Sequence, residues 1–131
     1  MRRSRLATLF ALLASGCLHA PSGPDPVATR QAIDRAAAQV RSCYRSPRVP
    51  FAARQIVTRL LVRFSAEGEP LGLPVVLRQD SLTTDNRPYA GTMAGAAVEA
   101  VLRCAPIRLP PELHAGGWDE FELTFSPSGI A

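Results

Sequence analysis

The 131-residue sequence contains no lysine, and all 15 of its basic side chains are arginines. Three of them, Arg2, Arg3 and Arg5, lie in the first five residues, so the rest of the chain carries 12 arginines against 11 acidic residues. A nearly neutral domain has no strong electrostatic attraction to a phosphate backbone. We therefore expect no binding to nucleic acid.

Histidine and cysteine are also scarce, with two and three copies. Their spacing is not that of a zinc site, and the chain has no G-x-S-x-G nucleophile elbow. His114 lies near Glu112 and Asp119 but has no serine or cysteine positioned beside it as a nucleophile. We therefore expect no catalytic residue, no metal, no cofactor and no small-molecule substrate, so the protein is not predicted to be an enzyme.

Long hydrophobic runs are missing as well. The apolar segment 6–16 spans 11 residues, whereas a membrane-spanning helix needs about 20. It follows a cluster of arginines, as the core of a signal peptide does. Ala14, Ser15 and Gly16 then precede Cys17, and this arrangement resembles a bacterial lipobox, in which the cysteine is lipidated and becomes the mature N-terminus.

These features divide the chain into a signal peptide (1–16), a linker (17–25) and a single domain (26–131). A secreted protein without lipid and an uncleaved anchor are the two alternatives, although Pro21 disfavours cleavage after Ala20. Leu18 stands where an aspartate would favour retention at the inner membrane. We expect a periplasmic location, with Cys17 anchored in the outer membrane.

The mature region has the patterns of two helices and three strands. An N-terminal Asp25-Pro26 pair predicts a helix start, and Gly68 is available for a positive φ in a turn. Pro74 suggests an edge position for the strand that contains it. Gly91 and Gly95 are expected to permit close helix–sheet packing. The expected elements are a helix from 26 to about 45, strands at 55–65 and 71–77, a helix from 88 to 104, and a strand at 118–125.

This order predicts an α+β fold, α-β-β-α-β. Residues 55–65 show the clearest alternation of the three strands, with one apolar face and one half-polar face. We therefore place this strand in the centre of the sheet. A right-handed crossover then gives an antiparallel three-stranded sheet of order 2-1-3, with both helices packed on one face.

Two cysteines remain if Cys17 carries lipid. Cys43 and Cys104 each lie in the last turn of an expected helix, and two helices on one face could bring those turns together. In an oxidising compartment they are a candidate disulfide. Two buried free thiols are the alternative.

Four segments resemble the C-terminal domain of TolA, in the broader TonB C-terminal-domain family. The likeness covers about residues 30–129, and the order and spacing of the segments are more specific than any one of them. The segments are VRSCY at 40–44, LVRFSAEG at 61–68, VLRCAP at 101–106 and LPPELHAGGWDEFELTFSP at 109–127.

The resemblance implies a periplasmic protein-binding module that connects to outer-membrane partners, with a Tol–Pal component among the candidates. Members of this kind are similar in carrying cysteines at positions 43 and 104, which supports the bridge. TolA-like proteins have an inner-membrane helix and a long helical arm, whereas a cleavable signal and a short linker are expected here. We therefore expect a free-standing, lipid-tethered domain. A TonB-like transport accessory and a structural or inhibitor-like envelope lipoprotein unrelated to Tol are the alternatives.

The last strand is the expected binding edge. It lacks proline, and the order 2-1-3 leaves its backbone groups unpaired on one side. The alternative is an edge that is merely shielded by its charges. Arg59 and Arg63 either contact an acidic partner or pair with Glu120 or Glu122 across the sheet, and Trp118 is either a partner contact or a core anchor. The expected edge residues are Asp119, Glu120, Phe121, Glu122, Leu123, Thr124 and Phe125.

If Cys17 carries the lipid, Cys17→Ser should release the protein from membranes into the soluble periplasm, because the hydrophobic anchor is lost. Fractionation of cells that express each form measures this. Retention of the variant in the membrane fraction would show that the lipobox interpretation is wrong.

Overall fold

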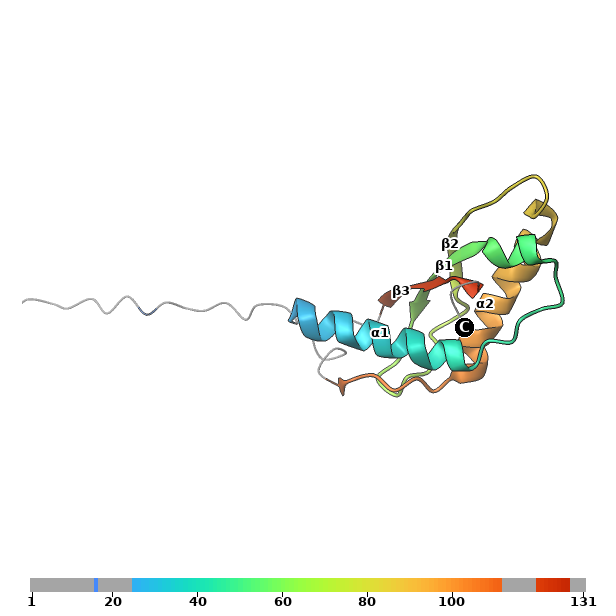
Figure 1. The fold of residues 1–131 in the computed structure, drawn as a ribbon. Helices are drawn as coiled ribbons and strands as arrows, with labels where there is room; N and C mark the ends of the chain where they lie inside the picture. The colour runs from blue at the N-terminus through green and yellow to red at the C-terminus, as the bar shows by residue number, and fades with distance from the viewer. Residues whose placement is uncertain (1–15, 17–24, 112–119, 128–131) are drawn as a thin grey trace, which may run out of the picture.

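The computed structural model describes residues 16, 25–111 and 120–127, and its elements follow the order α–β–β–α–β (Figure 1). The three strands form one antiparallel sheet of order β2-β1-β3. The predicted fold class and strand order are therefore confirmed. The elements are α1 (Pro26–Ser42), η1 (Phe51–Gln55), β1 (Val57–Arg63), β2 (Val75–Asp80), η2 (Arg87–Tyr89), α2 (Ala90–Cys104) and β3 (Glu120–Phe125).

Helix α1 begins at the predicted cap. The carboxylate of Asp25 accepts a hydrogen bond from the backbone N–H of Val27 at 3.0 Å, and Pro26 occupies the first turn. The helix ends at Ser42, earlier than the expected end near Arg45. The N–H groups of Cys43 and Tyr44 bond to carbonyls three residues back, at 3.0 and 3.1 Å, which tightens and closes the last turn.

The core lies between the helices and one face of the sheet. Alternate side chains of β1 and β3 are buried there, together with one stripe from each helix. Because strand side chains alternate between faces, the intervening residues of β1 and β3 lie on the opposite face, which we call the open face. The buried apolar residues of this cluster are Ala32, Ala36, Val40, Leu60, Val62, Phe64, Ala97, Ala100, Val101, Ile107, Phe121, Leu123 and Phe125.

The second strand begins later than predicted. Apolar residues alternate from 71 onwards, but Gly72 adopts a φ of +82° and Pro74 has no N–H to donate. The ladder with β1 therefore starts at Val75, which pairs with Leu61, and continues to Asp80. Pro74 lies before the strand rather than within it, and the expected strand at 71–77 is corrected to 75–80.

Two glycines of α2 differ from their expected role. An added Cβ at Gly91 or Gly95 would meet no atom within 4 Å, and both residues are exposed. They do not mediate close helix–sheet packing. Small side chains on the opposite side of the helix, at Ala97 and Ala100, are fully buried and take that role.

Gly68, in contrast, is required by the fold. It has a φ of +83°, as the turn predicts, and its carbonyl accepts the N–H of Ile107 at 2.9 Å. A Cβ built at this position would lie 1.9 Å from the carbonyl oxygen of Ile107. The turn between β1 and β2 is thus held against the segment that follows α2.

Gly68→Ala should lower the free energy of unfolding by about 2–4 kcal/mol, because it adds a backbone clash to an unfavourable φ. Gly72→Ala is the matched control. Gly72 has nearly the same φ but nothing within 4 Å of an added Cβ, so its cost should be about 1–2 kcal/mol. Chemical denaturation of both variants measures the difference, and equal losses would contradict the proposed role of the Ile107 contact.

Candidate functional site

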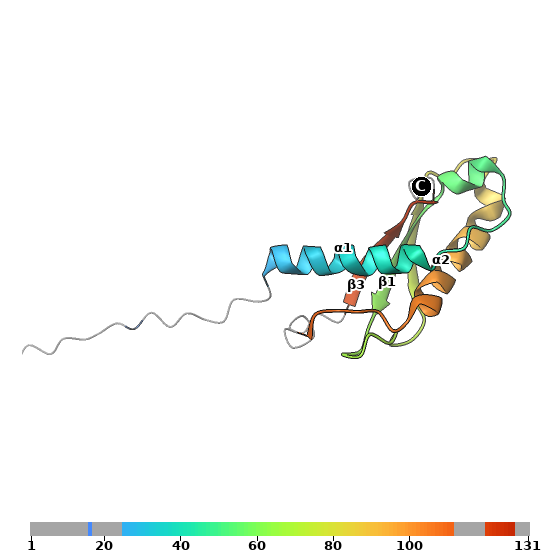
Figure 2. The same cartoon turned by 60° about the horizontal axis from the view of Figure 1, so that its bottom comes forward.

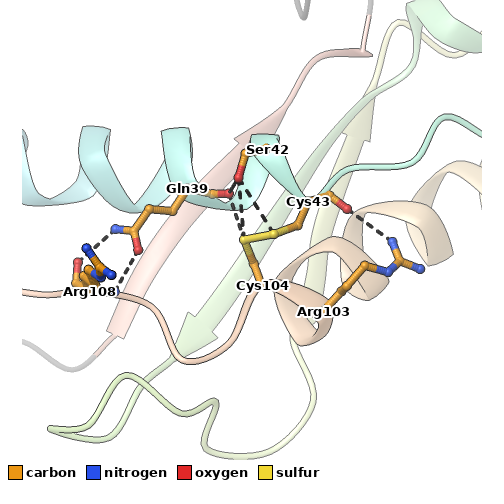
Figure 3. The surroundings of a disulfide bond; sticks show 6 residues. All are labelled: Gln39, Ser42, Cys43, Arg103, Cys104 and Arg108. Atoms are coloured by element: carbon orange, nitrogen blue, oxygen red, sulfur yellow. Dashed lines mark hydrogen bonds between the residues drawn. A yellow bond between two sulfur atoms is a disulfide. The ribbon is translucent and has the colours of Figure 1, made fainter.

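The C-terminal ends of the two helices meet at the predicted cysteine pair (Figure 3). The sulfur atoms of Cys43 and Cys104 are bonded at 2.01 Å, and their Cα atoms are 5.4 Å apart. Arg103 donates to the backbone carbonyl of Cys43 at 3.2 Å. The end of α1 is therefore joined to the end of α2 both covalently and by a hydrogen bond.

A glutamine side chain extends this junction toward β3. The amide of Gln39 donates to the carbonyl of Arg108 at 2.9 Å, and its oxygen accepts the N–H of Arg108 at 2.8 Å. Figure 3 shows the two bonds side by side. Because the pair satisfies both backbone groups of one residue, it holds the segment after α2 along α1.

Tyr44 lies next to this junction and packs on the third strand. Its ring centroid is 5.9 Å from that of Phe125. Its hydroxyl is buried without a hydrogen-bond partner among the described residues, and burial raises the pKa of the Tyr44 hydroxyl above its usual value. The side chain is thus a packing contact that holds the start of the 43–50 connection against β3.

The open face carries cross-strand ion pairs. Arg59 donates to Glu122 at 3.1 Å and lies 3.8 Å from Asp80. Arg63 lies 3.7 Å from Glu120. Of the two roles considered for Arg59 and Arg63, the structure places both side chains in pairs across the sheet. Such exposed pairs contribute little stability individually, and they align β3 with β1.

Strand β3 is an edge strand, and its three apolar side chains are buried in the core. Within residues 25–111 and 120–127, no segment pairs with its outer side. Trp118 and Asp119, which were predicted as a possible contact and as the first edge residue, lie outside the described residues, as does Cys17. The remaining predicted edge residues, Glu120–Phe125, all belong to β3.

A groove runs between the outer edge of β3 and α1. It has a volume of about 360 Å³. Figures 1 and 2 show that the N-terminal half of α1 extends beyond β3, on the side of β3 that faces away from β1. The lining residues are Arg30, Ile33, Asp34, Ala37, Arg41, Glu122, Leu123 and Thr124.

The groove combines an apolar strip with unpaired cations. Ile33 and Ala37 are half-buried against the core and form the strip. Arg30 and Arg41 make no ion pair among the described residues, although Asp34 lies between them in the sequence. Nothing in the spacing of these charges along α1 indicates that they face a strand edge.

Within residues 25–111 and 120–127, no group of three histidine, cysteine or carboxylate side chains could hold a metal ion. Among those same residues, no helix has both the length and the apolar character that a membrane span requires.

The disulfide should contribute up to about 4 kcal/mol of stability, because it closes a loop with a sequence separation of 61 residues. The double variant Cys43→Ser/Cys104→Ser should therefore unfold at a clearly lower denaturant concentration. Added reductant should shift the parent protein in the same way and leave the double variant unchanged. Mass spectrometry that finds two free thiols at these positions in the exported protein would contradict the bridge.

No family model, curated protein or solved structure matches this chain. Its function must therefore be inferred from its own residues and their arrangement.

Proposed function

We propose that this chain is a non-enzymatic protein-binding module of the cell envelope, similar in kind to the TolA C-terminal domain. The proposal rests mainly on one observation: the outer edge of β3, beside the groove under α1, pairs with no segment within residues 25–111 and 120–127. An edge strand without proline offers a row of backbone donors and acceptors to an extended segment of another protein.

The bound segment lies beside β3 as a fourth strand. Backbone hydrogen bonds supply affinity, and alternate side chains supply specificity because they point to opposite faces of the sheet. On the helix side these side chains meet Ile33 and Ala37, which favours apolar residues. Arg30 and Arg41 flank that strip, so acidic residues at its ends are favoured in the partner.

The partner is a periplasmic or outer-membrane protein, with a Tol–Pal component as the first candidate. A lipid on Cys17 would hold the module at the outer membrane through the linker 17–25, which reaches at most about 30 Å when fully extended. The role proposed is support of outer-membrane integrity by binding, without transmission of force from an inner-membrane motor.

A photo-crosslinking amino acid at position 124, in β3, should form an adduct with an envelope protein in intact cells. The same amino acid at position 92 is the control, because Thr92 is equally an exposed threonine but lies on α2. Mass spectrometry identifies the adduct. No adduct, or the same adduct at both positions, would contradict binding at the edge of β3.

The double variant Arg30→Glu/Arg41→Glu should reduce the yield of that adduct by roughly tenfold, since it turns two attractive ion pairs with an acidic partner into repulsive contacts. Arg54→Glu/Arg87→Glu changes the net charge equally at exposed sites outside the groove and should leave the yield unchanged. Equal losses from both double variants would mean that net charge, rather than the groove, governs binding.

A further inference from the structure

The opposite edge of the sheet is formed by β2, and it exposes apolar side chains. Five apolar side chains between residues 71 and 77, at and before β2, are exposed, of which Leu73 at 74% and Val75 at 56% are the most open. Contiguous exposed apolar surface on a folded domain marks a place where another surface packs. The five residues, which we call the β2 patch, are Leu71, Leu73, Val75, Val76 and Leu77.

The backbone of β2 is available beside this patch. Strand β1 pairs with its inner side, and within the described ranges nothing pairs with its outer side. A bulge at Leu77 interrupts the ladder, because Arg59 pairs with Arg78 while Leu60 pairs with Val76. The regular part on the C-terminal side of the bulge consists of Arg78, Gln79 and Asp80.

The charges of this regular part are self-complementary. Arg78 and Asp80 are two residues apart and therefore share the open face, where Arg78 donates to Asp80 at 3.2 Å. Their side chains are still 58% and 41% exposed, so each can also face a charge on a neighbouring strand. Gln79 points to the other face, where its amide is bound to Thr58 and to the carbonyl of Ala90. An antiparallel contact about Gln79 thus brings each arginine opposite the aspartate of an identical strand.

We propose that the occupant of this edge is a second copy of this chain, paired antiparallel about a two-fold axis near Gln79. In this arrangement Arg78 of each copy faces Asp80 of the other. Leu77 of the β2 patch directly precedes Arg78 and so lies at the end of this contact. A two-fold contact of this kind uses the same surface on both copies.

Charge distinguishes this edge from that of β3. Self-pairing of β3 would bring together two strands that each carry Glu120 and Glu122, and like charges across a pair are unfavourable. Strand β2 has one positive and one negative side chain, so self-pairing brings no net repulsion. The β3 edge therefore remains free for the different partner proposed above.

The contact is short, so the dimer is weak in dilute solution. Two copies anchored in one membrane would meet at a higher effective concentration, which favours the same contact there.

The test uses the full chain, purified in its disulfide-bonded form and studied by native mass spectrometry over a concentration series. Arg78→Asp alone and Asp80→Arg alone should each weaken the dimer on the order of tenfold, because each places like charges opposite one another. A mixture of the two variants should form a heterodimer at least as readily as the parent chain forms its homodimer. Their different masses identify it.

Leu77→Lys, in the β2 patch, and Leu102→Lys, on α2, form a matched pair, because the two leucines are 46% and 41% exposed. Only Leu77→Lys should weaken the dimer, and circular dichroism checks that both variants are folded. A parent chain that stays monomeric at every concentration would overturn the proposal. So would single variants that dimerise normally, a mixture without preferred heterodimers, or equal effects of the two lysines. Each result is independent of crosslinking at position 124.

Discussion

Strand β1 is the element on which the remaining structure depends, because it alone contacts a strand on each side within the described part of the chain. Its inward side chains, such as Leu60 and Val62, belong to one buried cluster with residues of both helices. Its outward arginines, Arg59 and Arg63, reach carboxylates on the neighbouring strands. A slip of one residue would exchange these two sets, burying the arginines and exposing the aliphatic residues. The register of β1 thus determines both the core and the surface.

Local sequence patterns were sufficient to predict the order of the helices and strands. They failed for features that depend on backbone conformation or on tertiary packing. The alternation along 55–65, the Asp25 cap and the turn at Gly68 are each carried by a few adjacent residues. The start of β2 was misplaced because apolar alternation runs on through 71–77, although Gly72 leaves the extended conformation.

Asn86 illustrates a second kind of failure. No sequence pattern distinguishes it from other polar residues, yet it is buried. Its amide donates to the carbonyls of Ala52 and Ser81, and its oxygen accepts the N–H of Thr83. The groove was not predicted from the sequence for the same physical reason, which is that it forms only through tertiary packing. Arg30 and Arg41 on α1 belong to it only because the helix passes beside a strand that lies about 80 residues further along the chain. Such a site depends on where a helix lies relative to a strand that is distant in the sequence.

The bridge between α1 and α2 has a mechanical consequence. Suppose that the lipid tether and the β3 partner proposed above apply tension between the start of α1 and β3. The covalent path of that load then runs along α1, across Cys43–Cys104 and through the following segment to β3. The loop between the cysteines, which includes β1 and β2, lies outside this path and cannot be drawn out as extra length. Under this load the disulfide acts as a mechanical bypass, and only the two segments outside the cysteine loop can extend.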